Sequence, residues 1–236
     1  MSLHTSRLLR MQAMLLKPRC ILCDDPGMPG PPMDLCAGCY RELPRLLSGC
    51  EICARPVTDQ GLICGSCQKN PPPFIRVIAP YRYAWPIDKM IQQFKFGGDL
   101  AMGRVLGCLL ARHLASVRPA GASAVVVPVP LHRRRLWQRG FNQAIEVARA
   151  LTLFMPITVH RDLCTRVRDT PAQVGKHADE RQRNLRHAFS LRNRAVPGQV
   201  VILDDVMTTG STCAELARTL KKRGCGQVLV WCLARA

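Results

Sequence analysis

Long apolar runs alternate with segments of helical periodicity along most of this chain. Three runs, at residues 124–129, 200–203 and 227–233, hold almost no polar residue and are rich in valine, isoleucine and leucine. Such runs predict strands that are buried on both faces of a sheet. Apolar residues at helical spacing predict helices at Ile87–Phe96 and Leu100–Val117, with a glycine pair between them. The pattern predicts an α/β domain with a parallel sheet.

Two further stretches complete the predicted elements of this domain. Phe74–Ala84 is rich in isoleucine, valine and tyrosine, which favours one or two strands. Gln143–Phe154 has apolar residues at helical spacing, and Asn142 can cap it. A stiff Asn-Pro-Pro-Pro linker at residues 70–73 precedes these elements. We therefore predict three parts: an N-terminal extension at 1–17, a small segment at 18–70 and the main domain at 71–236.

The second buried run ends in an unusual group of polar residues. Two carboxylates, Asp204 and Asp205, close the strand. A tight loop follows, made of Thr208, Thr209, Gly210, Ser211 and Thr212. Successive backbone N–H groups in a loop of small residues can converge on an anion.

A helix is predicted directly after this loop, and the third apolar run makes the region a βαβ unit. Thr212 and Glu215 have the spacing of a capping box, and Gly224 follows a basic helix end. A phosphate binds well at a helix N-terminus, while adjacent carboxylates accept hydrogen bonds from sugar hydroxyls. The pattern indicates a sugar-phosphate site at the carboxyl end of a strand. The alternative is an ordinary strand and helix joined by a polar turn.

Eight of the 13 cysteines form four Cys-x-x-Cys pairs. The pairs are separated by 12, 10 and 10 residues and comprise Cys20/Cys23, Cys36/Cys39, Cys50/Cys53 and Cys64/Cys67. One such pair could equally be redox-active, but four at near-regular spacing predict two tetrahedral Zn²⁺ sites of structural type. We pair the first two knuckles and the last two, while a crossed pairing stays open. The segment has few large apolar residues, so metal must supply much of its folding energy.

The net charge and the cysteine content limit which partners and which cellular compartment fit this chain. The formal net charge is +18, from 34 basic and 16 acidic residues, more than one small anionic ligand requires. A polyanionic partner such as nucleic acid is one explanation, and a merely basic surface is the other. The first 17 residues lack the pattern of a secretory signal, and we expect no apolar run to reach the length of a membrane span. Reduced, clustered thiols then predict a cytoplasmic protein.

A run of basic residues follows the first buried strand. Residues 131–143 contain His132 and four arginines, among them Arg133 and Arg139, before a turn at Gly140. Placed at the carboxyl end of a central strand, guanidinium groups suit bidentate contact with phosphates. The alternative is a solvated basic face.

Taken together, these motifs resemble a known family. The acid pair and loop are similar to the phosphoribosyl diphosphate (PRPP) signature of type I phosphoribosyltransferases. The four Cys-x-x-Cys pairs, the Pro-Val-Pro-Leu-His and Arg-Gly-Phe-Asn-Gln segments and this signature resemble the ComF (ComFC) family of competence proteins, from Cys20 to the C-terminus. The resemblance implies a double zinc ribbon followed by a type I phosphoribosyltransferase-like, Rossmann-like sheet with helices on both faces.

The resemblance also implies roles for individual residues. Asp204 and Asp205 would hold the ribose 2′ and 3′ hydroxyls, Thr208 to Thr212 would surround the 5′-phosphate, and Mg²⁺ would bind with PRPP. Residues 164–189 correspond to the mobile hood over the ligand, where we assign Arg166 and Arg168 to the site beside Arg133 and Arg139. A charged surface loop is the alternative for this hood.

The function implied by the resemblance is DNA uptake in natural competence, with cytoplasmic single-stranded DNA as a partner and a competence helicase or other DNA-uptake proteins as further partners. Activity stays open, because the loop has no carboxylate where hypoxanthine-type transferases carry one: Thr208 stands three positions after Asp205. The alternatives are a PRPP-sensing nucleic-acid-binding module without catalysis, or a phosphoribosyltransferase of nucleotide metabolism unrelated to competence. A PRPP-responsive regulator is a third, although no helix-turn-helix pattern supports it.

Overall fold

The computed structural model describes residues 18–28, 34–59, 61–117, 123–169, 187–192 and 194–236. The chain divides into two compact units, Met1–Leu43 and Pro44–Ala236. The predicted N-terminal extension at 1–17 and the middle of the predicted hood lie outside the described residues. Each unit is described by itself below.

The first unit is built around one pair of cysteine knuckles. A backbone bridge between Arg19 and Pro26 closes its first turn. Its one described helix, α2 (Ala37–Arg41), begins after Cys36, whose Sγ accepts a hydrogen bond from the Cys39 N–H. This small unit is therefore organised by its thiols.

The second unit begins with the other pair of knuckles. A bridge between Gly49 and Pro56 closes the third knuckle, and α3 (Gly65–Lys69) carries the fourth. The Val77 N–H donates to the Ile52 carbonyl, which joins this ribbon to the sheet. The ribbon thus shares a compact unit with the α/β domain, whereas the sequence boundary was placed near residue 70. The domain limits inferred from the sequence remain a prediction.

The sheet of the second unit is parallel throughout. Its order is β1-β8-β7-β3-β4, and β2 also pairs with β8. The strands are β1 (Val77–Ile78), β2 (Tyr81–Arg82), β3 (Ala124–Pro128), β4 (Ile157–Val159), β7 (Gln199–Met207) and β8 (Gln227–Arg235). Strand β7 continues beyond its apolar run, through the acid pair, because its pairing with β8 extends to Met207 opposite Arg235. The two predicted central strands, β3 and β7, are neighbours, so their carboxyl ends meet at one edge.

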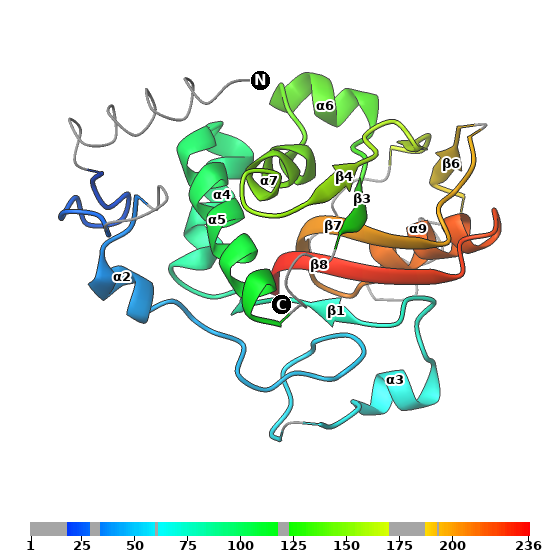
Figure 1. Cartoon of the computed structure of the whole chain (residues 1–236), viewed down its shortest axis with the longest axis horizontal. Helices are drawn as coiled ribbons and strands as arrows, with labels where there is room; N and C mark the ends of the chain where they lie inside the picture. Colours follow the sequence, from blue (N-terminus) through cyan, green and yellow to red (C-terminus); the bar gives the residue numbers. More distant parts are fainter. Residues whose placement is uncertain (1–17, 29–33, 60, 118–122, 170–186, 193) are drawn as a thin grey trace. The chain divides into compact units, whose positions relative to one another are not determined.

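Helices cover both faces of this sheet (Figure 1). Val200 and Ile202 of β7 share an apolar cluster with α9 (Ser211–Lys221), while the alternate residues Val201 and Leu203 point to the other face. That other face carries three helices, α4 (Ile87–Gly97), α5 (Leu100–Val117) and α7 (Gln143–Leu151). The predicted fold class, an α/β parallel sheet with helices on both faces, is confirmed.

Helix α5 corrects one expectation from the sequence. It has 18 residues and a hydropathy of 1.3, which is long and apolar enough for a membrane span. More than half of it, 56%, is buried within the protein. It packs against α4 and α7, so burial in the core accounts for its apolar composition.

Two small elements border the carboxyl edge of the sheet. A two-stranded antiparallel sheet, β5 (Cys164–Arg166) with β6 (Phe189–Leu191), forms the described ends of the predicted hood. Helix α6 (Arg133–Arg139) contains the arginine run and ends at Gly140, which has a φ of 80°. A bridge between His132 and Arg166 brings the hood to the start of this helix.

Candidate functional site

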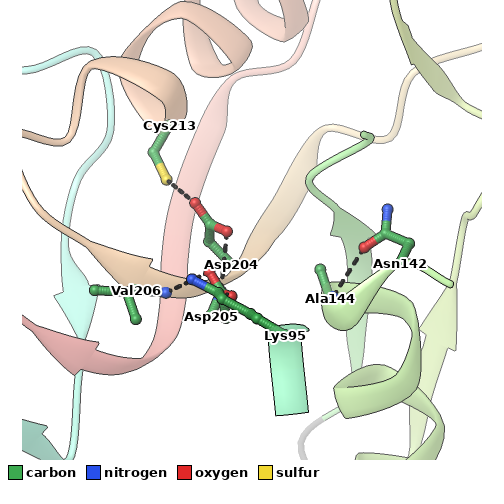
Figure 2. A network of polar contacts seen from close by, with 7 residues as sticks. All are labelled: Lys95, Asn142, Ala144, Asp204, Asp205, Val206 and Cys213. Atoms are coloured by element: carbon green, nitrogen blue, oxygen red, sulfur yellow. Dashed lines mark hydrogen bonds and ion pairs between the residues drawn. The ribbon is translucent and has the colours of Figure 1, made fainter. Parts of the chain in front are cut away.

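The acid pair lies at the carboxyl end of the central strand β7, with a cation beside it (Figure 2). The Lys95 Nζ is 2.6 Å from Asp205 Oδ2, and both side chains are largely buried. The backbone N–H of Asp205 donates to Asp204 Oδ1 at 2.9 Å, and the Cys213 thiol points to Asp204 Oδ2 at 3.9 Å. Asp204 thus faces α9 and Asp205 faces α4, as the alternation of a strand requires.

Burial and neighbouring charges shift the pKa values of two of these groups. Burial raises the pKa of Asp204 to about 6, although the charges of Lys95 and Arg166 oppose the rise. Burial also lowers the pKa of Lys95 to about 8, with Asp204 acting to raise it and Arg139 acting to lower it. Lys95 therefore makes its short contact with Asp205 while its charge also acts on Asp204. At neutral pH Asp204 and Lys95 are therefore mostly charged.

Lys95 was missed by the sequence reasoning. A signal was present, because Ile87, Ile91 and Lys95 are spaced by four residues and therefore lie on one helical stripe. The first two are fully buried, so a lysine on the same stripe is carried toward the interior. A buried stripe that ends in a charged residue is a pattern that indicates a functional site.

The loop after β7 has the form expected of an anion site. Gly210 is the N-cap of α9 with a φ of 78° and offers no side-chain cap, while the Ser211 N–H donates to the Thr209 Oγ1 at 3.4 Å. The hydroxyls of Thr209 and Ser211 contact each other at 2.9 Å. A Cβ at position 210 would lie 2.4 Å from the Met207 Cε, the end of a flexible side chain, so it is chiefly the positive φ that favours glycine there. Beyond the Ser211 N–H, the donors in the first turn of α9 are open to an external acceptor.

The predicted capping box at this helix is wrong. Helix α9 begins at Ser211, two residues earlier than it would with Thr212 as the N-cap. The Glu215 carboxylate instead accepts a hydrogen bond from the His187 N–H at 2.9 Å and pairs with Arg218 at 3.2 Å. Glu215 therefore ties the hood to the helix, and the helix N-terminus keeps its donors.

The structure brings some of the predicted arginines to the acid pair and leaves others outside. The charge of Arg166 acts on Asp204, and that of Arg139 acts on Lys95. Burial, and then the charge of Arg135, lowers the pKa of both Arg139 and Arg166. Arg133 and Arg168 are exposed. Lys95 and Arg166 therefore act directly on the acids, and Arg139 and Arg135 act on these cations, so that four cations of the group outnumber the two carboxylates.

Asn142 positions the segment that follows β3. Its side chain is 7% exposed; the oxygen accepts from the Ala144 and Ile145 N–H groups, and the nitrogen donates to the Val129 carbonyl at 3.0 Å. The Val129 N–H in turn donates to the Leu203 carbonyl, next to the acid pair. The predicted cap is confirmed, and it holds the start of the arginine segment against β7.

The eight predicted zinc ligands form two clusters. Cys20, Cys23, Cys36 and Cys39 make one, Cys50, Cys53, Cys64 and Cys67 make the other, and within each all sulfur atoms lie within 4.8 Å of one another. The Cys23–Cys36 and Cys53–Cys64 sulfurs are 3.6 and 3.7 Å apart. Four thiolates bound at ~2.3 Å around a tetrahedral zinc would have sulfurs ~3.8 Å apart, so both clusters fit Zn²⁺. The knuckles pair first with second and third with fourth, as predicted.

One thiol in each cluster, Cys20 and Cys50, lies among backbone N–H donors that favour the thiolate, as a metal ligand does. Burial opposes ionisation of Cys50, but the backbone N–H groups of Cys53, Cys64 and Ile52 lower its pKa to about 6. Zinc requires thiolates, and N–H donors to sulfur stabilise them. None of the 13 cysteines, all of which lie in the described part of the chain, forms a disulfide.

Comparison with known proteins places the chain in a family. Residues 11–68 match the model of the double zinc ribbon domain. The chain is 36% identical over 204 residues to the DNA utilization protein YhgH of Escherichia coli K12, covering 85% of this chain and 90% of the relative. It is 33% identical over 208 residues to competence protein F of Haemophilus influenzae, with 86% and 90% covered.

Solved structures give a weaker likeness. A hypoxanthine phosphoribosyl transferase of Trypanosoma cruzi matches with a TM-score of 0.35 and 16% identity, over 56% of this chain and 64% of that one. The family assignment rests on the sequence relatives. With a double zinc ribbon and a third of its residues shared with these proteins over most of their length, the chain belongs to the ComF family, that of competence protein F and YhgH.

Proposed function

We propose that this protein binds PRPP together with Mg²⁺ at the acid pair and the Thr208–Thr212 loop, and that it acts on single-stranded DNA in the cytoplasm during DNA uptake. Its relatives are named for competence and for DNA utilization, which supports the second part. One observation supports the first part above all. Two carboxylates lie near the carboxyl end of the central strand, and a short loop leads from the end of that strand to the N-terminus of α9, whose N-cap is Gly210.

The arrangement meets the opposite demands of a phosphorylated sugar. Asp204 and Asp205 accept hydrogen bonds from ribose hydroxyls, and the N–H groups at the start of α9, with the Thr209 and Ser211 hydroxyls, donate to a phosphate. Carboxylate oxygens are also the ligands that Mg²⁺ prefers, and the bound ion would neutralise charge on a diphosphate. The acid pair therefore fits the metal that such a ligand brings.

The cations around the acids would hold the diphosphate. Lys95, Arg139 and Arg166 lie within electrostatic reach of the acid pair or of one another, and Arg135 adds a further positive charge. Crowded, partly buried cations gain from an added anion, because it relieves their mutual repulsion. In a transfer reaction the same groups would stabilise the departing diphosphate, by positioning and electrostatics.

Isothermal titration of PRPP with Mg²⁺ tests this site. We expect micromolar-range binding to the wild type and a loss of at least about 100-fold in Asp204→Asn/Asp205→Asn, because each charge-assisted hydrogen bond contributes about 1.5–3 kcal/mol. Asp162→Asn, at an exposed acid outside the site, is the matched control. Equal affinity in the double variant and the wild type would remove the acids from the site.

The pH dependence of the same titration is a second readout. Affinity should fall below about pH 6, as Asp204 gains a proton, and above about pH 8, as Lys95 loses one. The basic limb should disappear in Lys95→Met. Release of diphosphate from PRPP with candidate bases or single-stranded DNA then separates a transferase from a PRPP-sensing module, since the module binds without turnover.

An exposed tryptophan supports the nucleic-acid part. Trp137 of α6 is 88% exposed and lines a surface hollow of about 510 Å³ with Arg133 and Arg134. An aromatic ring beside guanidinium groups can stack on a base while phosphates pair with the cations. Two other aromatic residues are not available for stacking, because Tyr81 is buried and Phe141 packs on Phe94.

Oligonucleotide binding measured by fluorescence anisotropy tests this surface. Trp137→Ala should weaken binding of a short single strand by about 5-fold or more, in line with stacking energies of about 1–3 kcal/mol per base. Trp85→Ala is the control, at a ring that is also exposed, 64%, but lies before α4. Binding that ignores added salt, or that both variants leave unchanged, would exclude this surface.

A further inference from the structure

Arg235, at the end of β8, is buried and connects distant segments of the chain. Its side chain is one of the largest that are fully buried, and only 2% of the residue is exposed. Its Nε donates to the Cys53 carbonyl at 2.9 Å, and its Nη1 donates to the Met207 carbonyl at 2.8 Å. The same Nη1 also contacts the carbonyls of Thr208 and Ala236. One guanidinium therefore joins the third cysteine knuckle to the loop that follows β7.

The Cys53 carbonyl is fixed by the geometry of the second thiol cluster. Cys53 is one of its four ligands, and its sulfur lies 3.7 Å from that of Cys64. Within the knuckle the Ala54 N–H donates to the Cys50 carbonyl, and Ala54 has a φ of 54°. A left-handed conformation at a non-glycine residue is held by its surroundings, which here include the metal ligands on both sides. The position of this carbonyl therefore depends on the closed knuckle.

The other end of the link is the start of the Thr208–Thr212 loop. Met207 is 2% exposed, and its side chain lies directly under Gly210, where a Cβ would meet it at 2.4 Å. Gly210 in turn sets the first turn of α9. Holding the Met207 and Thr208 carbonyls thus holds the path of the loop to the helix N-terminus.

The link is strong enough to transmit a change. A buried carbonyl that loses its donor is left without a hydrogen bond, which is unfavourable, and Arg235 donates to carbonyls at both ends of the link. Cys50, Cys53 and Cys67 also share one apolar cluster with Met207 and Cys213. Displacement of the knuckle would therefore shift the loop rather than be absorbed by solvent.

We propose that Arg235 is a positioning residue that couples zinc in the second cluster to ligand binding at the Thr208–Thr212 loop. The inference rests on the proposed PRPP site for the identity of the ligand. Coupling between two sites is reciprocal, so PRPP must then retain the second zinc by the same factor by which that zinc favours PRPP. The first cluster, in the other compact unit, serves as an internal reference.

The experiment follows zinc release from the full chain to a zinc-selective chromogenic chelator, with and without saturating PRPP and Mg²⁺. Cys23→Ser/Cys39→Ser, which lacks the first site, identifies the signal of the second. We expect PRPP to slow release of the second zinc about 5-fold or more, in the usual range of coupling between sites, and to leave the first unchanged. Equal rates with and without bound PRPP would overturn the coupling.

Arg235→Lys separates the link from the ligand site. This variant keeps the charge but loses the fork that reaches both carbonyls. Even without ligand it should release the second zinc faster than the wild type, with the first unchanged, and it should bind PRPP more weakly. Arg82→Lys is the matched control, because Arg82 lies opposite Arg235 in the β2–β8 pairing and is exposed.

The outcomes distinguish this inference from the proposed function. If the wild type does not bind PRPP, the proposed site fails, and the ligand-free zinc release of Arg235→Lys still decides whether Arg235 supports the knuckle. If PRPP binds while Arg235→Lys matches the wild type in zinc release and in affinity, the link is excluded and the site survives. A variant too unstable to purify leaves the wild-type release experiment as the deciding one.

Discussion

The two thiol clusters use the same ligands at the same spacing, yet they belong to different kinds of structure. In the first cluster, Cys23 is exposed and Cys39 partly exposed, within a small unit whose described helix has five residues. In the second, three of the four cysteines are buried in an apolar cluster that includes Val77, Cys213 and Leu216. The first closes a compact unit of its own, while the second is part of the core of the α/β domain.

The difference shows that a repeated motif need not have a repeated role. Zinc in the first site can stabilise only the turns that carry its ligands. Zinc in the second site stabilises a ribbon whose backbone bonds to the sheet at Val77 and to Arg235 of β8. Loss of the second zinc should therefore destabilise the whole α/β domain, whereas loss of the first zinc should not.

The largest effect is expected from shortening the chain at two different points. A chain that begins at Pro44 keeps the second ribbon and should unfold within a few degrees of the full chain. A chain that begins at Pro71 loses Cys50, Cys53 and Cys67 from the core, so we expect no cooperative unfolding. Circular dichroism with heating measures both.

These two shortened chains test directly whether the second ribbon belongs to the α/β domain and the first does not. Cooperative unfolding of the chain from Pro71 would support the boundary that the sequence suggested and would show that the second ribbon is dispensable for the α/β core. Failure of the chain from Pro44 would show instead that the first unit is required.

A smaller effect is expected from single cysteine changes at matched positions. Cys53→Ser and Cys23→Ser each remove the second cysteine of the first knuckle in their site. We expect Cys53→Ser to lower the free energy of unfolding of the second unit by about 3 kcal/mol or more, because structural zinc contributes a large share of folding energy. Cys23→Ser should change it by less than about 0.5 kcal/mol.

Tryptophan fluorescence during urea unfolding measures this difference. The three tryptophans, Trp85, Trp137 and Trp231, all lie in the second unit, and Trp231 is 1% exposed. The signal therefore reports that unit alone. Equal losses in the two variants would contradict the comparison.

The sequence predicted the sheet because its central strands are plain in the pattern. Fully apolar runs mark β3, β7 and β8, and Leu100–Val117 was placed with its observed bounds. The pattern did not show that β7 continues through Asp204 and Asp205 to Met207, because pairing with β8 decides where that strand ends. Nor did it show the association of the second ribbon with the sheet, which depends on contacts between residues far apart, such as Arg235 and Cys53.

The sequence predicted those parts of the candidate site that are short motifs. The acids, the loop and the thiol pairs are each formed by residues close together in the sequence, so the pattern alone indicates them. Lys95 lies more than a hundred residues before the acids; its place on the buried stripe of α4 is visible in the sequence, but only the packing of α4 shows that it meets Asp205. Arg133 and Arg139 have the same residue type in one helix, and only the fold shows that Arg139 faces Lys95 while Arg133 is exposed.

The smallest effect we expect is a gain in stability from Asp204→Asn. The folded-state pKa of Asp204 is raised from 3.8 to about 6, so the native protein binds the proton more tightly than the unfolded chain does. The free energy of unfolding therefore falls as the pH rises from about 4 to about 6, because the carboxyl then ionises while it is buried. At about 1.4 kcal/mol per pKa unit the shift of about two units corresponds to at most about 3 kcal/mol at pH 7. Asparagine only approximates a protonated carboxyl, so we expect Asp204→Asn to raise the free energy of unfolding by about 1–2 kcal/mol of this.

The advantage should shrink toward pH 4 and vanish only below about pH 3, where the wild-type carboxyl is protonated in both the folded and the unfolded state. Urea unfolding followed by tryptophan fluorescence at pH 4 and pH 7 measures this change, with Asp162→Asn as the control at an exposed acid. Because Asp204 lies in the unit that holds the second zinc, the gain should slow release of that zinc and leave the first unchanged. A charge that is kept buried at a cost in stability is expected where it serves binding. Asp204→Asn should therefore stabilise the same unit whose PRPP affinity it lowers. A variant that is no more stable than the wild type at pH 7 would show that the buried charge does not destabilise the protein.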